Sequence, residues 1–543
     1  MQYTQLSPGS HQSGDERIIW LLANILFNDG FEDDISARVP ARLRPGSLPR
    51  IKKDRLSRLW SQLIREKQVD NFGSLEERAI LLLCSHSVDE ACRALIQSGN
   101  LHLASLVAQI GRDPTTQSDM KKQIETWRQH NMYSEMEEPI RALYELLAGN
   151  ALVSEGKSGG PLEDRISTFS FTERFGLDWL QAFGLRLWYS ITADEPIEAA
   201  VSKFAGDLAS GSELAFPSPP HLGEGAVQSG SSTDSLGRES PLWVLLKVYA
   251  ATAGGVKDGA STLEFPAALL PESVSGDALT NRLSFQLHQM LASTVGQYNS
   301  FKIDVVQADH LTYDYTWELA SSGQLEQALF VLLHLSHAAD REWAVKDMLA
   351  RFAPKLPSPV SASAADSSRS ASWRVLTADL QLPEAWIWVA KALYCRDIGD
   401  ATGEVDCLIR GKNWNDAHAT FCRIVAPSAV IERDYDTLKA LLSGFSNEPE
   451  KKVSGWASGG GVYEDFVVLA TTTSAPKGRD RARLSRLMNA LNSIGERIRR
   501  QNHVVEGLEE RVAFQEMGNA VVAWTMNDPE VSFHIHLLQK KGS

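Results

Sequence analysis

Apolar residues recur along this chain at the three- and four-residue spacing of amphipathic helices. The first clear stripe consists of Ile18, Ile19, Leu22, Ile25 and Leu26. Further stripes follow at 56–63 and 80–83, and no series of alternating apolar and polar residues marks a set of hairpin strands. The pattern therefore predicts an all-α protein.

One segment is apolar on every side of a helix. Residues 328–335 are apolar except for His334. The run is far shorter than the roughly 20 residues that a membrane-spanning helix needs. Because a helix that is apolar all round is buried on all sides, we expect residues 328–335 to form a central helix of a stacked helical array.

Three segments share a Gly, then a Leu or Trp, then an Ala: residues 95–111, 319–335 and 408–424. A glycine readily takes the left-handed conformation that ends a helix, and a small alanine permits close approach of two helices. The residues in these roles are Gly99, Gly323 and Gly411, with Ala104, Ala328 and Ala417. Each segment is therefore interpreted as a helical hairpin, which must stack on its neighbours to bury its apolar face.

Two segments rich in Pro, Gly, Ser and Ala interrupt the helical pattern, at 216–240 and 354–372. We expect both to be flexible loops between helices. A third break, rich in Gly, at 454–463 precedes a last helical block.

The composition of the chain argues against some classes of function and predicts a folded protein. The net charge is −14, from 54 Lys and Arg against 68 Asp and Glu, which argues against nucleic acid as the main partner. The hydrophobic content of 43% and the 14 Trp residues predict that most of the chain folds. The polar start lacks the features of a signal peptide, so we expect the five cysteines to be reduced thiols.

Candidate metal ligands are few. His334 and His337 have a spacing that suits a shared metal, but no further Glu or Cys stands at a recognisable distance. Cys84, His86 and Cys92 lie close together without the paired-cysteine spacing of a zinc knuckle. We therefore predict no metal site, and interpret these residues as core or interface side chains.

A phosphate-binding loop is suggested by Gly156, Lys157 and Ser158, within residues 151–160. The first glycine of that motif would be residue 151, which is Ala, and a helical pattern precedes it instead of a strand. No other catalytic or dinucleotide-binding motif is present, so we expect no enzyme activity and no cofactor.

The last helical block combines seven arginines between 479 and 500 with an apolar stripe. The stripe consists of Leu484, Leu487, Leu491, Ile494, Ile498, Val505, Leu508 and Val512. The arginines are either an RNA-binding surface or the exposed face of an amphipathic helix. In the second case the stripe packs within the chain or binds a partner, through Leu487, Leu491, Ile494 and Ile498.

Four segments together resemble a known family: residues 83–111, 175–191, 315–335 and 384–421, in this order. The chain is similar to the scaffold nucleoporins of the nucleoporin 96 and nucleoporin 145C type. These are members of the Y-shaped coat complex of the nuclear pore. The resemblance covers most of residues 16–445.

The resemblance implies an elongated helical solenoid that folds back on itself into a trunk, a crown and a tail. We expect residues 1–15 to be disordered and the crown, with its loop at 216–240, to occupy 87–277. The trunk would combine 16–86 with 278–445, including the loop at 354–372, and the tail would occupy 446–543.

The resemblance also implies a structural role at the nuclear pore complex in the nuclear envelope, in support of mRNA export, protein import and pore assembly. Family members bind a neighbouring helical nucleoporin through the crown, where Trp179, Phe183 and Trp188 are candidate contacts or, alternatively, core residues. The tail meets the hub of the Y complex.

Members also donate a β-blade, placed before the first helix, to a WD-repeat propeller shared with the COPII coat. About fifteen polar residues precede Ile18 here, and we expect no such blade in them. The alternatives to a pore scaffold are an RNA-binding adaptor that uses the arginine-rich tail and a COPII-like vesicle-coat subunit.

Overall fold

The computed structural model describes residues 14–28, 44–67, 73–111, 114–157, 165–219, 239–252, 263–264, 269, 271, 281–295, 301–302, 305–357, 367–472, 479–500 and 507–526. The chain divides into two compact units, residues 1–318 and residues 319–543, and each is considered by itself.

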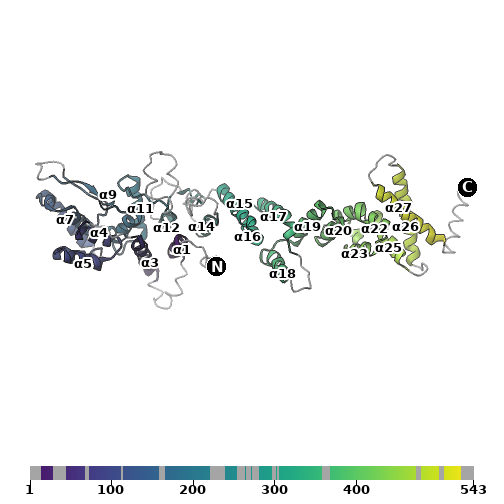
Figure 1. Cartoon of the computed structure of the whole chain (residues 1–543), viewed down its shortest axis with the longest axis horizontal. Helices are drawn as coiled ribbons and strands as arrows, with labels where there is room; N and C mark the ends of the chain where they lie inside the picture. Colours follow the sequence, from purple (N-terminus) through teal and green to yellow (C-terminus); the bar gives the residue numbers. More distant parts are fainter. Residues whose placement is uncertain are drawn as a thin grey trace. The chain divides into compact units, whose positions relative to one another are not determined.

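The described residues are almost entirely helical, as predicted (Figure 1). The few strands contain two residues each. Antiparallel strands β1 (Val153–Ser154) and β2 (Phe169–Ser170) form one pair, and parallel strands β3 (Leu263–Glu264) and β4 (Phe301–Lys302) form the other. The all-α fold class is therefore confirmed, whereas the boundaries of trunk, crown and tail remain a prediction.

The first unit contains α1 (Gly14–Phe27), α3 (Arg44–Lys67), α4 (Leu75–Cys84), α5 (Val88–Gln97), α6 (Leu101–Val107), α7 (Pro114–Gln129), η2 (Met132–Glu135), α8 (Glu138–Leu147), α9 (Phe171–Phe175), α10 (Trp179–Leu185), η4 (Arg186–Ser190), α11 (Ile197–Ala209), α12 (Pro241–Thr252), α14 (Arg282–Val295) and most of α15 (Val305–Ser321). Its first helix packs against α12, and α3 packs against α10. An ion pair of 2.6 Å joins Glu16 of α1 to Arg282 of α14. Helices far apart in the sequence thus share one core in this unit.

The second unit contains α16 (Leu325–Leu332), α17 (Ala338–Arg351), η8 (Ala353–Lys355), α18 (Ser367–Arg374), η10 (Val375–Asp379), α19 (Glu384–Asp397), α20 (Ala401–Arg410), α21 (Trp414–Thr420), η11 (Phe421–Val425), α22 (Ala426–Glu432), α23 (Tyr435–Gly444), α24 (Pro449–Lys452), η12 (Trp456–Ser458), α25 (Gly460–Thr471), α26 (Arg479–Arg500) and α27 (Leu508–Met526). Neighbours in sequence pack on one another, from α16 on α17 through α19 on α20 and α20 on α21. This succession within the unit (Figure 1) is the stacked array that the repeats predict.

One turn recurs between consecutive helices and explains the repeats. A residue in the left-handed region ends the first helix, and the next residue donates its backbone N–H to the carbonyl five residues earlier. Gly99 and Gly323 hold this conformation, with φ of 86° and 82°. The same turn occurs with the residue pairs His86–Ser87, Gly99–Asn100, Gly323–Gln324, Gly399–Asp400, Lys412–Asn413 and Arg433–Asp434.

The position four residues after the second member of each pair is buried, which fixes the next helix against its predecessor. These residues are Ala91, Ala104, Ala328, Glu404, Ala417 and Leu438. The predicted role of the three repeat alanines in close helix approach is therefore confirmed at Ala104, Ala328 and Ala417.

The prediction for Gly411 is wrong in one respect. Gly411 has φ of −75°, and the left-handed residue is its neighbour Lys412, with φ of 59°. A Cβ atom at Gly411 would lie 3.0 Å from Cβ of Trp388 on α19. Glycine is therefore needed there for the close approach of two helices, while the turn itself is carried by lysine.

The apolar run at 328–335 forms a helix that is buried on one side only. Helix α16 ends at Leu332, and Ala328, Leu329 and Val331 are buried, but the Phe330 side chain is 49% exposed. Its ring contacts His334 edge-on at 4.8 Å between ring centres. The expectation of burial on all sides is therefore corrected, because this array covers one face of α16 and leaves Phe330 uncovered.

The predicted loops fall largely outside the described residues, which exclude 1–13, 220–238 and 358–366. Helix α18 begins at Ser367 and so occupies the end of the segment predicted as a loop at 354–372. The Gly-rich break at 454–463 contains η12 and the start of α25.

Candidate partner-binding surfaces

The aromatic residues predicted to bind a partner through the crown lie in the core of the first unit. Trp179, Phe183 and Trp188 are all buried. The Trp60 ring packs edge-on against Trp179 and Phe183, at 5.7 and 5.0 Å between ring centres. This placement favours the core alternative, since a buried ring has no surface to offer a partner.

Helix α3 supplies the hydrogen bonds that hold this core. The indole N–H of Trp60 donates to the carbonyl of Leu180 at 2.8 Å, and the indole N–H of Trp188 donates to Oγ of Ser57 at 2.6 Å. Buried indoles need such acceptors, because an unpaired N–H inside a protein is destabilising. Sequence reasoning missed these pairs because more than a hundred residues separate the partners.

The predicted tail stripe is divided between two helices. On α26, Leu487 and Ile494 are buried and Leu491 is half-buried, in packing against α25 and α27. The side chain of Ile498 lies outside the described residues. The α26 part of the stripe is thus mainly a packing face, because two neighbouring helices cover it.

The end of the stripe lies on α27 and faces outward. Leu508, Val512 and Val522 are 67%, 39% and 52% exposed, whereas Ala513, Met517 and Val521 are buried. At about 100° per residue the exposed three share one face of α27 and the buried three share the opposite face. Gln515 and Asn519 are exposed on the same face, so the surface combines three apolar residues with polar ones, and we consider it a candidate partner-binding surface.

Two of the tail arginines are engaged in the packing of α26. Arg486 binds both carboxylate oxygens of Asp465 on α25, at 2.8 and 3.1 Å, and Arg483 lies 3.6 Å from the same carboxylate. The Asp465 carboxylate raises the pKa of Arg486. These contacts serve the fold and give no support to an RNA-binding adaptor.

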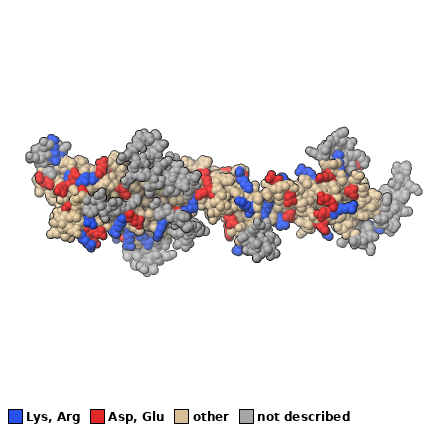
Figure 2. Space-filling view, viewed as in Figure 1, with Lys and Arg blue, Asp and Glu red and all other residues tan. Residues whose placement is uncertain are grey.

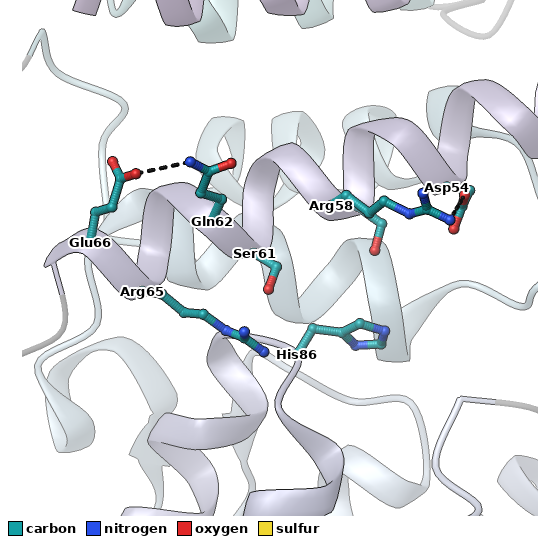
Figure 3. Close-up of a pocket in the computed structure, with 8 residues that line it drawn as sticks. Asp54, Arg58, Ser61, Gln62, Arg65, Glu66 and His86 are labelled. Atoms are coloured by element: carbon teal, nitrogen blue, oxygen red, sulfur yellow. Dashed lines mark hydrogen bonds and ion pairs between the residues drawn. The ribbon is translucent and has the colours of Figure 1, made fainter. Parts of the chain in front are cut away.

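A groove of about 540 Å³ lies along α3 (Figure 3). Its lining consists of Asp54, Ser57, Arg58, Ser61, Gln62, Arg65, Glu66 and His86. His86 is the left-handed residue of the turn between α4 and α5, with φ of 60°. Its ring is stacked on Trp188, with 4.8 Å between ring centres and 16° between ring planes.

Electrostatics in the groove keep His86 neutral near pH 7. Burial lowers the pKa of His86, and the nearby Arg65 guanidinium lowers that pKa further. Arg65 donates from Nη2 to Oγ of Ser87 at 2.8 Å. The groove therefore has a fixed aromatic wall with a positive charge beside it.

The other candidate residues considered for metal or phosphate binding lie in the following positions. His334 Nδ1 lies 3.1 Å from the carbonyl of Phe330, and His337 is exposed at the start of α17. Lys157 exchanges both backbone hydrogen bonds with Ile166 in an antiparallel bridge, an arrangement unlike a phosphate-binding loop. Among the described residues, no group of three or more His, Cys, Asp and Glu is placed to hold a metal ion.

The cysteines are free thiols, and the described helices do not meet the requirements of a membrane span. All five cysteines are unpaired, and burial raises the pKa of Cys407 and of Cys422 to about 12, which keeps both thiols protonated. Within the described part of the chain, none of the helices has the length and apolar character needed to cross a bilayer.

Comparison with known proteins identifies relatives. The family model described as Nuclear protein 96 matches residues 77–394. Nucleoporin NUP145 of Chaetomium thermophilum is 33% identical over 450 residues, which is 82% of this chain and 21% of the relative. Nucleoporin nup189 of Schizosaccharomyces pombe is 30% identical over 473 residues, 84% of this chain and 24% of the relative.

A plant protein shows the same relationship at lower identity. Nuclear pore complex protein NUP96 of Arabidopsis thaliana is 22% identical over 481 residues, which is 84% of this chain and 42% of the relative. The chain thus spans less than half of the length of each of these relatives.

Proposed function

The chain belongs to the Nuclear protein 96 family, and from that membership we propose that it is a structural scaffold subunit of the nuclear pore complex coat. The match over residues 77–394 is the observation that carries the proposal. Relatives over most of the chain are named as nucleoporins or nuclear pore complex proteins, which supports a location at the nuclear pore in the nuclear envelope. In this role the protein supports mRNA export and protein import.

The mechanism is mechanical support and involves no catalysis. Stacked helical hairpins hold partner-binding surfaces at fixed separations, because each hairpin is locked to the next by a recurrent turn and a buried contact.

Two protein contacts belong to the proposal. The first unit, which contains the whole of the predicted crown, binds a neighbouring helical coat nucleoporin. The tail binds the hub of the Y complex, and the exposed face of α27 formed by Leu508, Val512 and Val522 is the surface we assign to this contact. Binding to a WD-repeat propeller is not part of the proposed function, because no propeller-completing blade was expected in the polar residues before Ile18. Residues 1–13 lie outside the described residues.

Light scattering coupled to gel filtration tests the scaffold role. The chain is measured alone and then mixed with the neighbouring helical coat nucleoporin. We expect a stoichiometric heterodimer of defined mass. If the chain elutes alone under conditions in which both proteins are folded, the proposed contact is wrong for this protein.

The tail surface has its own test. Val512→Asp places a charge on the exposed face of α27, and we expect loss of hub binding with unchanged helicity, because this side chain is not part of the core. Leu393→Asp is the matched control, since Leu393 is an exposed apolar residue on α19. Equal binding by both variants would show that α27 is not the contact surface.

A further inference from the structure

The groove along α3 contains a positive charge that no carboxylate of the described chain neutralises. Arg58 pairs with Asp54 at 2.8 Å, and Glu66 accepts a hydrogen bond from Gln62 at 3.1 Å. Arg65, in contrast, donates to the neutral Ser87 hydroxyl and forms no ion pair with any described residue. Arg65 is exposed and lines the groove.

The side chains around Arg65 are arranged on one side of the helix. Figure 3 shows Ser61, Arg65 and His86 together on one side of α3, whereas Gln62 and Glu66 point away from them. Ser61 donates its hydroxyl to the carbonyl of Ser85 at 2.7 Å, and the His86 ring is held by Trp188. The site is therefore preorganised, because its polar groups are already fixed before anything binds.

Charge along α3 favours an acidic ligand. The helix has eight basic residues and two acidic ones, a net charge of +6, in a chain whose net charge is −14. Figure 2 shows Lys and Arg gathered over this part of the first unit. This local excess of positive charge attracts an acidic segment to α3, while the groove lining itself is balanced, with Arg58 and Arg65 against Asp54 and Glu66.

The acidic residues beside the groove make a protein segment a better fit than nucleic acid. Asp54 and Glu66 line the two ends of the groove, and Asp194 pairs with Arg50 further along the helix at 2.7 Å. A continuous phosphate backbone along α3 would pass all three carboxylates. A peptide with isolated carboxylates can avoid them and present one acid to Arg65.

We propose that the α3 groove is a docking site for an acidic segment of a partner protein, with a carboxylate bound by the Arg65 guanidinium beside Ser61 and His86. The planar fork of arginine offers two parallel N–H donors, which a carboxylate accepts as a pair. This site lies on the first unit, apart from the α27 surface, and the proposal does not depend on the scaffold partners.

Fluorescence anisotropy with the full chain tests the proposal. The probe is a labelled peptide of alternating Glu and Ser, compared with its Lys and Ser counterpart and with single-stranded DNA of similar length. We expect the acidic peptide to bind and Arg65→Ala to weaken it about tenfold, the effect of losing one charge-assisted hydrogen-bond pair. Arg93→Ala, an exposed arginine on α5, is the matched control and should leave binding unchanged.

A second variant distinguishes a direct effect on peptide binding from an indirect effect through folding. Ser61→Glu adds a negative charge to the groove and leaves Arg65 in place, so it should weaken the acidic peptide as strongly as Arg65→Ala. Circular dichroism of both variants should match that of the unaltered chain.

Two results would overturn the proposal: unchanged peptide affinity in both variants, or DNA bound more tightly than the peptide and lost in Arg65→Ala. Heterodimer formation with the neighbouring nucleoporin is measured separately. Its failure would concern the scaffold proposal alone.

Discussion

The left-handed position of the recurrent turn is occupied by glycine at Gly99, Gly323 and Gly399, but by His86, Lys412 and Arg433 in the three other copies. A residue with a Cβ atom is strained in this region, because the side chain approaches the following carbonyl. The turn is therefore imposed on these three residues by the helices on either side. At the scale of the residue, the fold tolerates strain where sequence alone would place glycine.

Lys412→Gly should relieve this strain and raise the free energy of unfolding by roughly 0.5 to 1 kcal/mol. Urea denaturation followed by circular dichroism measures the change. Lys439→Gly is the control, since Lys439 is an exposed residue inside α23, where glycine should lower the free energy of unfolding by about 1 kcal/mol. A loss of stability in Lys412→Gly would contradict the interpretation of the turn.

His418 makes stability depend on pH. Its Nε2 accepts the backbone N–H of Gly460 at 2.9 Å, and burial lowers the pKa of this imidazole. Below an unfolded pKa of about 6.5, the unfolded chain binds a proton that the folded chain resists, so stability falls as pH falls. We expect the melting temperature to drop between about pH 7.5 and about pH 5.5.

His418→Gln should reduce the dependence of the melting temperature on pH. His102→Gln, an exposed control on α6, should leave this dependence unchanged. Part of the pH dependence of the melting temperature should remain in His418→Gln, because burial also lowers the pKa of His86 and of His288. An equal pH dependence of the melting temperature in both variants would show that His418 does not contribute to it.

At the scale of the element, a buried arginine joins three segments of the first unit. Arg186 in η4 binds Asp207 of α11 and Glu213 beyond that helix, both at 2.8 Å. The side chains of Arg186 and Glu213 are 2% and 1% exposed, and Oε1 of Glu213 accepts the Thr172 hydroxyl at 2.6 Å. This network fixes the segment after α11 against α9, which no apolar contact pattern would have predicted.

Removal of this arginine should be costly, because it leaves Glu213 charged and buried. We expect Arg186→Ala to lower the free energy of unfolding by about 3 to 5 kcal/mol in urea denaturation. Arg174→Ala is the control. Arg174 also binds two carboxylates, Glu77 and Glu138, at 2.9 and 2.6 Å, but it is more exposed, and its loss should lower stability by about 1 kcal/mol or less. Similar losses in the two variants would contradict the role assigned to burial.

At the scale of the whole molecule, two compact units divide the chain within α15, between residues 318 and 319. Helices α16, α17, α19, α20 and α21 pack mainly on their neighbours in this order, while α27 packs back on α22. The stability of such an array is a sum of local terms, so a long enough part of it folds without the rest. The scaffold role requires that the helical array keep its structure along its whole length.

The fragment 305–543, which keeps α15 complete, should therefore fold alone. We expect a helical circular dichroism spectrum and a cooperative thermal transition. The fragment 1–304 is the complementary sample. A fragment 305–543 without a cooperative transition would show that the second unit needs contacts from the first.

The sequence by itself determined the fold class and the hairpin turns, because both depend on local physics. Apolar residues at helical spacing define one buried stripe per helix, and a small residue four positions into the next helix allows close packing. The family resemblance rests on the same local segments and was confirmed by the family match over residues 77–394.

Only the tertiary structure decided which apolar side chains are covered. Trp179 and Phe183 are buried because Trp60, far away in the sequence, lies against them, while Phe330 in the apolar run at 328–335 is 49% exposed. Periodicity identifies the stripe that faces a neighbour, but the number of neighbours that a helix has is set by distant parts of the chain. The same reason hid the α3 groove, which exists only where the turn at His86 meets a helix more than twenty residues earlier.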